Sequence, residues 1–261
     1  MRLLFFRHGD PDYEADSLTE KGKKEAALLA ETVQGFNIDD VYVSPLGRAA
    51  DTAEYSLKKL GKEAVTCQWL MEFPAQFDPE LADDKTRRAY CNELSIDEKT
   101  GKFNKRIVWD VMPSYHMDHP ELFDGNAWRE SELVRCTDMP KLYEEVTTSF
   151  DKLMAEYGYD RRGRVYDVRK SSDKVIAFFC HFGITSILLS YIWNVSPFVT
   201  LQNLAMAPTS VTELVTEERE KGIAIFRTLR TGDISHLTMG DEQPSFSARF
   251  CERFENEDER H

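Results

Sequence analysis

The sequence lacks the features that mark disulfide-bonded, exported or membrane-spanning proteins. Its five cysteines are odd in number, scattered along the chain and never arranged as CxxC, which favours reduced thiols. No apolar stretch approaches the ~20 residues that cross a bilayer, and even VIAFFCHFGITSILLSYIW is interrupted by His181 and Gly183. The first apolar run ends at a charged triplet after Phe6, unlike a signal peptide. We therefore expect a cytoplasmic protein.

Positive charge is also scarce. The chain has 33 Lys and Arg against 46 Asp and Glu, a formal net charge of -13. An acidic chain binds nucleic acids and anionic membranes poorly, so we expect neither as a partner. An anionic ligand would need a local basic pocket, which makes any cluster of arginine and histidine informative. The sequence leaves the oligomeric state open.

The first 72 residues alternate short apolar runs with amphipathic helices. Predicted strands cover residues 1–6, 39–45 and 64–72. Between them lie two predicted helices, each stopped by a glycine, Gly35 and Gly61. This alternation of strand and helix is typical of an α/β fold with a mostly parallel sheet.

The alternation stops after residue 72. Residues 73–138 are polar and rich in prolines and aromatics, and we predict that they form an insertion over the sheet. The later predicted elements are, in order, a helix at 140–157, a basic turn or hairpin at 158–173, a strand at 174–180 followed by a helix, and an antiparallel pair, SVTELV and IAIFRTL. We predict one domain over residues 1–261, with residues 73–138 a cap-like subregion and residues 241–261 a polar C-terminal tail.

Charged or imidazole side chains follow three of the apolar strands. Arg7 and His8 follow the first strand, Arg48 follows VYVSPLG, and His181 follows VIAFFC. In open α/β sheets, ligands bind in the crevice beyond the carboxyl ends of parallel strands, where helix N-termini add positive dipole ends. Two arginines and two histidines gathered there predict a cationic pocket, and arginine grips phosphoryl groups bidentately.

Several motifs resemble those of one family. FFRHGDP resembles the RHG signature of the histidine phosphatase superfamily, also called the phosphoglycerate mutase-like family. SPLGRAADTA is similar to its SPLxRAxxTA stretch, and SLTEKGKKEA to its LTxxGxxQA stretch, with Glu25 where glutamine is usual. VIAFFCHFGI resembles its second-histidine strand, and APTSVTEL its late NxSVTxL strand. The resemblance implies a three-layer α/β/α sandwich with a mostly parallel central sheet.

The resemblance also implies roles for the residues of the pocket. His8 would be the nucleophile, held neutral by a backbone carbonyl on one ring nitrogen, and would become a phosphohistidine. Arg7, Arg48 and His181 would surround the phosphoryl oxygens. Gly9 would let the backbone approach the phosphate, and Phe182 would complete the substrate-binding set. No metal or cofactor is implied, because the protein supplies the positive charge.

A proton donor for the leaving group must lie near the ester oxygen. One branch of the family carries an acid directly after the second histidine, but Phe182 occupies that position here. The other branch places a glutamate after the third strand, and WLMEF offers Glu72. Its rivals are Glu80, Asp10 and Asp12.

We therefore expect a metal-independent phosphomonoesterase acting on a small-molecule phosphate ester. One alternative is phosphoglycerate mutase-type transfer, although residues 72–76, EFPAQ, lack the LNERHYG-like stretch of the glycolytic enzymes. Another is a non-catalytic binder of a phosphorylated ligand. YHMDHP has the spacing of metal ligands but no partner motif. The arginines of DRRGR, at 161, 162 and 164, could contact a distal charge of the substrate or form a solvated turn.

Overall fold

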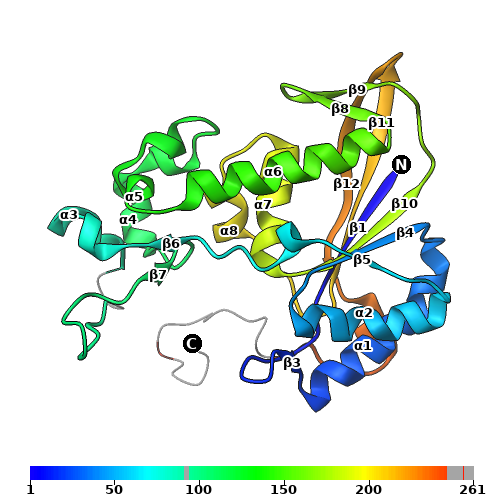
Figure 1. Cartoon of the computed structure of the whole chain (residues 1–261), viewed down its shortest axis with the longest axis horizontal. Coiled ribbons are helices and arrows are strands. Elements are labelled where there is room, and N and C mark those ends of the chain that lie inside the picture. Colours follow the sequence, from blue (N-terminus) through cyan, green and yellow to red (C-terminus); the bar gives the residue numbers. More distant parts are fainter. Residues whose placement is uncertain (91–93, 246–254, 256–261) are drawn as a thin grey trace. The chain divides into compact units, whose positions relative to one another are not determined.

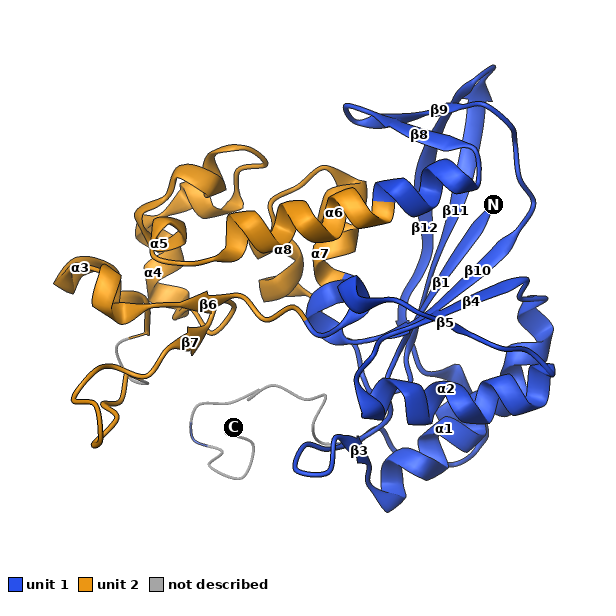
Figure 2. Cartoon of the chain, viewed as in Figure 1, with its two compact units in different colours: residues 1–72, 151–185, 205–261 blue, residues 73–150, 186–204 orange. Residues whose placement is uncertain are grey.

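The computed structural model describes residues 1–90, 94–245 and 255. Two compact units make up the chain, and Figure 2 colours them separately. Unit 1 comprises residues 1–72, 151–185 and 205–261, and unit 2 comprises residues 73–150 and 186–204. The region predicted as a cap-like insertion, residues 73–138, falls entirely in unit 2; that it covers a crevice stays a prediction.

Among the described residues, unit 1 contains an eight-stranded sheet with the order β5-β4-β10-β1-β11-β12-β9-β8. The strands are β1 (Arg2–Arg7), β4 (Asp40–Val43), β5 (Val65–Thr66), β8 (Tyr159–Arg162), β9 (Val165–Val168), β10 (Val175–Cys180), β11 (Val211–Glu220) and β12 (Ile223–Asp233). The pairs β5-β4, β4-β10 and β10-β1 are parallel, and β11, β12, β9 and β8 continue the sheet antiparallel (Figure 1). The predicted α/β class and the parallel strands at the site are thus observed.

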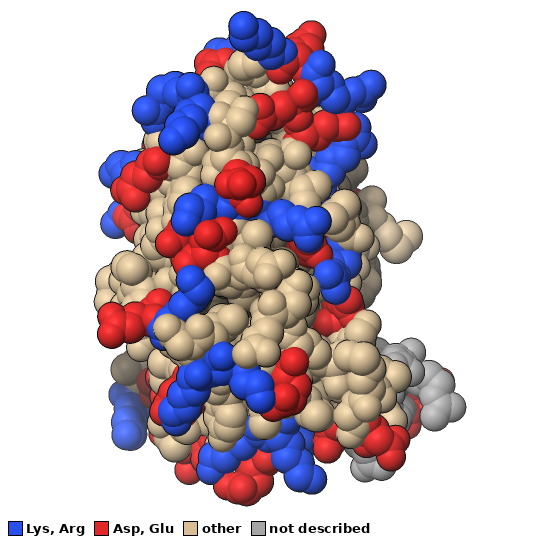
Figure 3. All heavy atoms as spheres, turned by 90° about the vertical axis from the view of Figure 1, so that its right-hand side faces the viewer, with Lys and Arg blue, Asp and Glu red and all other residues tan. Residues whose placement is uncertain are grey.

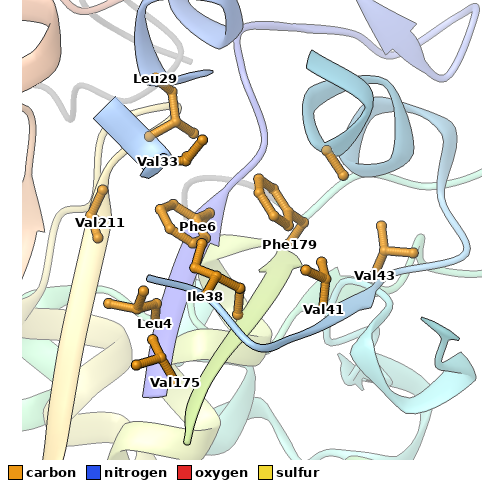
Figure 4. Packing of buried hydrophobic residues seen from close by; sticks show 12 residues of the cluster. Leu4, Phe6, Leu29, Val33, Ile38, Val41, Val43, Val175, Phe179 and Val211 are labelled. Carbon is orange, nitrogen blue, oxygen red and sulfur yellow. The ribbon is translucent and has the colours of Figure 1, made fainter. Parts of the chain in front are cut away.

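One face of the parallel strands packs against two helices, α1 (Glu20–Thr32) and α2 (Gly47–Leu60). Figure 4 shows Phe6 of β1 and Phe179 of β10 beside Leu29 and Val33. The rings of Phe6 and Phe179 stack with centroids 4.7 Å apart. Alternate residues of the same strands are buried on the opposite face, where β10 has no exposed position. Burial on both faces is what a three-layer sandwich requires.

Local sequence signals set the helix ends. Thr19 caps α1 by accepting a hydrogen bond from the Gly22 amide. Gly61 ends α2 in the left-handed conformation, with φ of 62°. The predicted stop of the first helix at Gly35 was wrong. The helix ends at Thr32, and a 3₁₀ turn, Val33–Phe36, carries the chain past Gly35.

The third predicted strand, residues 64–72, was also wrong in length. Only Val65–Thr66 pairs, at the edge of the sheet, and a 3₁₀ turn, Gln68–Leu70, follows. Both strand residues are exposed, so no buried face extends the pairing. The remaining elements of unit 1 are a small sheet of β2 (Pro11–Asp12) and β3 (Ser17–Leu18), and helix α9 (Ser235–Met239).

Unit 2 is built from short elements. They are β6 (Gln76–Phe77), β7 (Arg106–Ile107), α3 (Asp84–Arg87), α4 (Pro113–Asp118), α5 (Glu132–Arg135) and α8 (Pro197–Asn203). Two longer helices, α6 (Met139–Glu156) and α7 (Phe182–Trp193), contribute residues to both units. Phe73, Phe77, Tyr90 and Trp128 are fully buried, and the rings of Phe77 and Tyr90 stack at 4.6 Å. These aromatics therefore form a core of their own.

The surface and the tail complete the description. Figure 3 shows Lys and Arg interspersed with Asp and Glu over one face of the molecule. No helix among the described residues has both the length and the apolar character to traverse a bilayer. Most of the predicted polar tail, residues 246–254 and 256–261, lies outside the described residues.

Candidate active site

The parallel strands bring residues distant in sequence to one edge of unit 1. β10 lies between β1 and β4, and Arg7 pairs in register with Cys180. The His8 amide donates to the Cys180 carbonyl at 3.0 Å, and the Ser44 amide donates to the Phe179 carbonyl at 2.9 Å. The residues that follow the three strands, His8, Ser44 and His181, therefore meet, as the sequence predicts.

His8 is buried and held in one tautomer. Its Nδ1 lies 2.7 Å from the carbonyl oxygen of Gly9, so Nδ1 carries the proton and donates, leaving a lone pair on Nε2. This is the backbone contact expected of a neutral nucleophile. Burial, together with the nearby charge of Arg7 and the His181 ring, lowers the pKa of His8 well below its ordinary value.

Gly9 joins two motifs. Its amide donates to the Thr52 hydroxyl at 2.9 Å, and that hydroxyl donates to the Arg48 carbonyl at 2.7 Å. A Cβ at Gly9 would lie 2.7 Å from the carbonyl oxygen of Gly22 in α1. The close approach of this helix requires a glycine at position 9, which gives it a packing role beside the predicted one.

His181 presents one ring nitrogen without a protein partner. Its Nε2 lies 2.7 Å from the Ser44 hydroxyl, which also accepts from the Leu46 amide at 3.2 Å. A hydroxyl can accept two hydrogen bonds and donate one, so the contact fits both tautomers of the neutral ring; in the tautomer whose Nε2 accepts from Ser44, the proton sits on Nδ1. Nδ1 is buried and has no hydrogen-bond partner among the described residues. Burial, Arg48 and Arg7 lower the pKa of His181 to about 3.

Arg7 lies in the same buried space. Its guanidinium donates from Nη1 to the Met206 carbonyl and lies 5.9 Å from the centre of the Phe182 ring. Burial lowers the pKa of Arg7, and the carboxylate of Glu72 opposes that shift. Within the described part of the chain, its buried Nε–H has no partner.

Arg48 is held by Asp16, a residue that the sequence analysis missed. Asp16 Oδ1 lies 2.6 Å from Nη1 of Arg48, and Oδ2 accepts from the Gly47 amide at 2.7 Å. The buried Nε–H of Arg48 has no partner among the described residues. One carboxylate thus fixes the arginine while also capping the N-terminus of α2.

Glu72 reaches the same edge. Its Oε1 accepts from the Ile184 amide at 3.2 Å, in the first turn of α7, three residues after His181. The rival acids are engaged elsewhere. Asp10 accepts from the Thr19 hydroxyl, Asp12 accepts from the amides of residues 14 and 15, and Glu80 accepts from the Phe103 amide.

Carboxylates already occupy one amide at the N-terminus of each of two helices. The Gly47 amide of α2 and the Ile184 amide of α7 are occupied by carboxylates. Among the described residues, three buried side-chain nitrogens at this edge have no hydrogen-bond partner: Nε of Arg7, Nε of Arg48 and Nδ1 of His181. Positions Ser44 and Thr52 were also missed, although the fixed serine and threonine of SPLxRAxxTA could have indicated them.

Two other candidates take ordinary structural roles. In YHMDHP, the His119 ring stacks on Tyr115 at 3.9 Å and its Nδ1 lies 2.9 Å from Glu121, while the His116 ring meets Phe123 edge-on. The described residues hold no group of three or more His, Cys, Asp or Glu placed for a metal ion. In the basic turn, now the β8–β9 hairpin, the side chain at 162 pairs with Asp167.

Comparison with known proteins agrees with this geometry. The model of the histidine phosphatase superfamily (branch 1) matches residues 3–95. A 2,3-bisphosphoglycerate-dependent phosphoglycerate mutase of Thermoplasma acidophilum is 34% identical over 124 residues, 42% of this chain and 59% of that protein. The probable phosphoglycerate mutase GpmB of Photorhabdus laumondii is 28% identical over 150 residues, 54% of this chain and 65% of that protein. The chain thus spans less than two thirds of these relatives' length.

Solved structures share the fold at low identity. A mycobacterial glucosyl-3-phosphoglycerate phosphatase with inorganic phosphate superposes with a TM-score of 0.54 and 18% identity, covering 90% of this chain and 98% of that one. A phosphoserine phosphatase of Entamoeba histolytica with 3-phosphoglyceric acid gives 0.51 and 14%, covering 90% and 98%. These likenesses support the α/β, phosphoglycerate mutase-like architecture. Motifs, fold and family match point the same way: over residues 3–95 the chain is similar to the histidine phosphatase superfamily (branch 1), and its fold is shared by solved structures of phosphatases.

Proposed function

We propose that this chain is a metal-independent phosphomonoesterase that acts through a phosphohistidine on His8. One observation carries the proposal. A neutral imidazole with its lone pair on Nε2 lies against a second histidine, with ring centroids 5.0 Å apart. Three buried side-chain nitrogens, Nε of Arg7, Nε of Arg48 and Nδ1 of His181, have no partner in the described part of the chain. Buried donors without partners are costly in a folded protein, and the oxygens of a phosphoryl group would satisfy them.

In the first step, Nε2 of His8 attacks phosphorus in line. The N–P bond forms as the ester P–O bond breaks, and the leaving oxygen takes a proton from Glu72. Arg7, Arg48 and His181 stabilise the charge on the three equatorial oxygens. Because the Nδ1–H of His8 donates to Gly9, the imidazole keeps the tautomer that attack requires.

In the second step, water attacks the phosphohistidine. Glu72, now a carboxylate, takes the proton of that water as the N–P bond breaks and inorganic phosphate forms. The electrons return to Nε2, so His8 regains its neutral state. The same carboxylate thus serves first as acid and then as base.

Mutase-type transfer is the second candidate, and the names of the two curated relatives favour it. A mutase must hold its product while the phosphoryl group returns to another hydroxyl. Residues 72–76, EFPAQ, offer no cation after Glu72 for that purpose. This absence of basic residues supports hydrolysis over transfer.

The test uses enzyme treated with EDTA and a panel of phosphate monoesters that includes 3-phosphoglycerate, alongside His8→Ala. We expect release of inorganic phosphate by the wild type and none by the variant. Interconversion of phosphoglycerates without phosphate release would establish the mutase. Binding of phosphate esters without any turnover would leave a phospholigand-binding protein.

A further inference from the structure

We propose that the C-terminal segment, defined here as residues 233–245, positions the loop that carries the nucleophile, residues 7–10, through His236 and Glu25. The inference rests on the proposed role of His8. In Figure 1 this segment follows β12 and leads toward α1. Two separate chains of hydrogen bonds connect it to the loop, and neither uses a group that would touch the phosphoryl oxygens.

The first chain runs through His236. This histidine is buried, and its Nε2 lies 2.9 Å from the Thr209 hydroxyl. That hydroxyl donates its only proton to the Pro208 carbonyl at 2.7 Å. Nε2 of His236 must therefore be the donor, which places a proton on Nε2. Burial lowers the pKa of His236 to about 4, in accord with a neutral ring.

Thr209 connects His236 to the main chain at His8. Its amide lies 3.1 Å from the carbonyl oxygens of both Arg7 and His8, and donates between them. Thr209 has a φ of 59°, which is strained for a β-branched residue. Such a conformation persists only where the surrounding residues stabilise it. The hydrogen bond from His236 to the Thr209 hydroxyl stabilises it here. His236 is thus a positioning residue for the main chain at His8.

The second chain runs through Glu25 of α1. Its two carboxylate oxygens accept one amide each, from Asp10 at 2.9 Å and from Ser245 at 3.0 Å. Glu25 is fully buried. Because the two amides contact different oxygens, a glutamine in this geometry would place its NH₂ group against one of them. The LTxxGxxQA stretch has glutamine at this position. Glu25 therefore fits a chain in which the C-terminal segment supplies a second N–H group, the amide of Ser245.

Contacts with α1 keep the segment in place. Lys21 Nζ donates to the Glu242 carboxylate and to the Gln243 carbonyl, each at 2.7 Å. Gly240 approaches Leu28 so closely that a Cβ would lie 2.4 Å from a methyl group of that leucine. The segment is therefore fitted to the helix that carries Glu25.

The test uses the full chain with His236→Leu, which removes the donor, and His236→Gln, which returns an N–H group. Met239→Ala, an exposed position on the same short helix, is the matched control. We would measure kcat and KM for p-nitrophenyl phosphate per folded molecule, and the ¹⁵N chemical shifts of the His8 ring, which report its tautomer. We expect His236→Leu to lower kcat roughly tenfold to a hundredfold with little change in KM, and to mix the His8 tautomers. We expect His236→Gln to recover most of the rate.

Thr209→Gly provides a second variant if His236→Leu does not fold. Glycine adopts a positive φ without strain, so we expect an equal or higher Tm together with a lower kcat. A purely structural contact would not lower kcat while stability is kept. Wild-type kcat and His8 shifts in these variants would overturn the inference. If the wild type turns over no phosphate ester, the proposed function fails, and the His8 shifts alone then decide whether the segment positions this ring.

Discussion

The two units differ in how their residues are organised. Unit 1 has a continuous sheet with both faces of its central strands buried, and it holds every residue of the candidate site. Unit 2 consists of short helices, turns and a two-stranded pair around buried aromatics such as Trp128. Histidine, glutamate and arginine occur in both units, yet among the described residues the ends of parallel strands bring them together in unit 1. The comparison teaches that register in a parallel sheet, and not residue type, concentrates the chemistry.

The largest expected difference is between histidines. His8→Ala should reduce phosphate release on the order of 10⁴-fold or more, because it removes the atom that forms the covalent intermediate. His116→Ala in unit 2, where the ring packs on Phe123, should leave kcat close to that of the wild type. Phosphate release and phosphohistidine labelling measure both. An equal loss in the two variants would end the distinction between the units.

The second comparison is between glutamates. Glu72→Gln should lower kcat by about 10³-fold for an alkyl phosphate, because the amide cannot protonate the leaving oxygen. The loss should be much smaller for p-nitrophenyl phosphate, whose leaving group needs little protonation. Glu80→Gln is the matched control. In the wild type, Glu80 accepts a hydrogen bond from the Phe103 amide within unit 2. If kcat falls by the same factor for both substrates, Glu72 is not the general acid.

The third comparison is between arginines. Arg48→Lys keeps the charge but removes Nε–H and the planar fork, so kcat/KM should fall by about 10²-fold. Arg106→Lys in unit 2, where the arginine pairs with Asp110 at 3.2 Å, should change stability more than kcat/KM. Steady-state kinetics and urea unfolding separate the two effects. Full activity in Arg48→Lys would show that position 48 needs charge alone.

The smallest expected effect is on pH stability. His181 and His236 have their pKa values lowered to about 3 and about 4 in the folded chain. In the unfolded chain these two histidines take up protons near pH 6.5, whereas in the folded chain they stay neutral at that pH. The free energy of unfolding is therefore highest above pH 6.5 and decreases as the pH falls below it. Each ring should contribute a slope of about 1.4 kcal/mol per pH unit.

Urea unfolding at pH 7 and pH 5 checks this slope. The variant His236→Leu should lose one ring's share of it, whereas His116→Ala should change it less, because His116 is only half-buried. Equal slopes in the wild type and His236→Leu would contradict the assigned pKa of His236.

The regular parts of unit 1 were predictable from the sequence. The apolar run before Arg7 and the run before His181 are strands, as their short length and the turn residues that follow them predict. Gly61 stopped its helix as expected. The same patterns placed Arg7, His8, Arg48 and His181 at one edge, because the ends of parallel strands coincide.

What the sequence did not reveal depends on contacts between distant segments. Asp16 carries no local pattern, and its role appears only when Arg48 lies beside it. Thr209 adopts a positive φ that no propensity favours for threonine. In unit 2, turns and short helices follow tertiary packing, which periodicity cannot report.

The place of β10 between β1 and β4 has a consequence for how the molecule is made. The first two site motifs emerge early in synthesis, but the strand that joins them ends at Cys180. The pairing of β10 with β1 and β4 therefore cannot form until more than a hundred further residues have been synthesised. Pairings that distant in sequence form slowly, and nascent chains with unpaired strand edges associate with one another. Catalytic competence should thus be acquired late in folding, and shortened chains that end before residue 174 should be prone to aggregate.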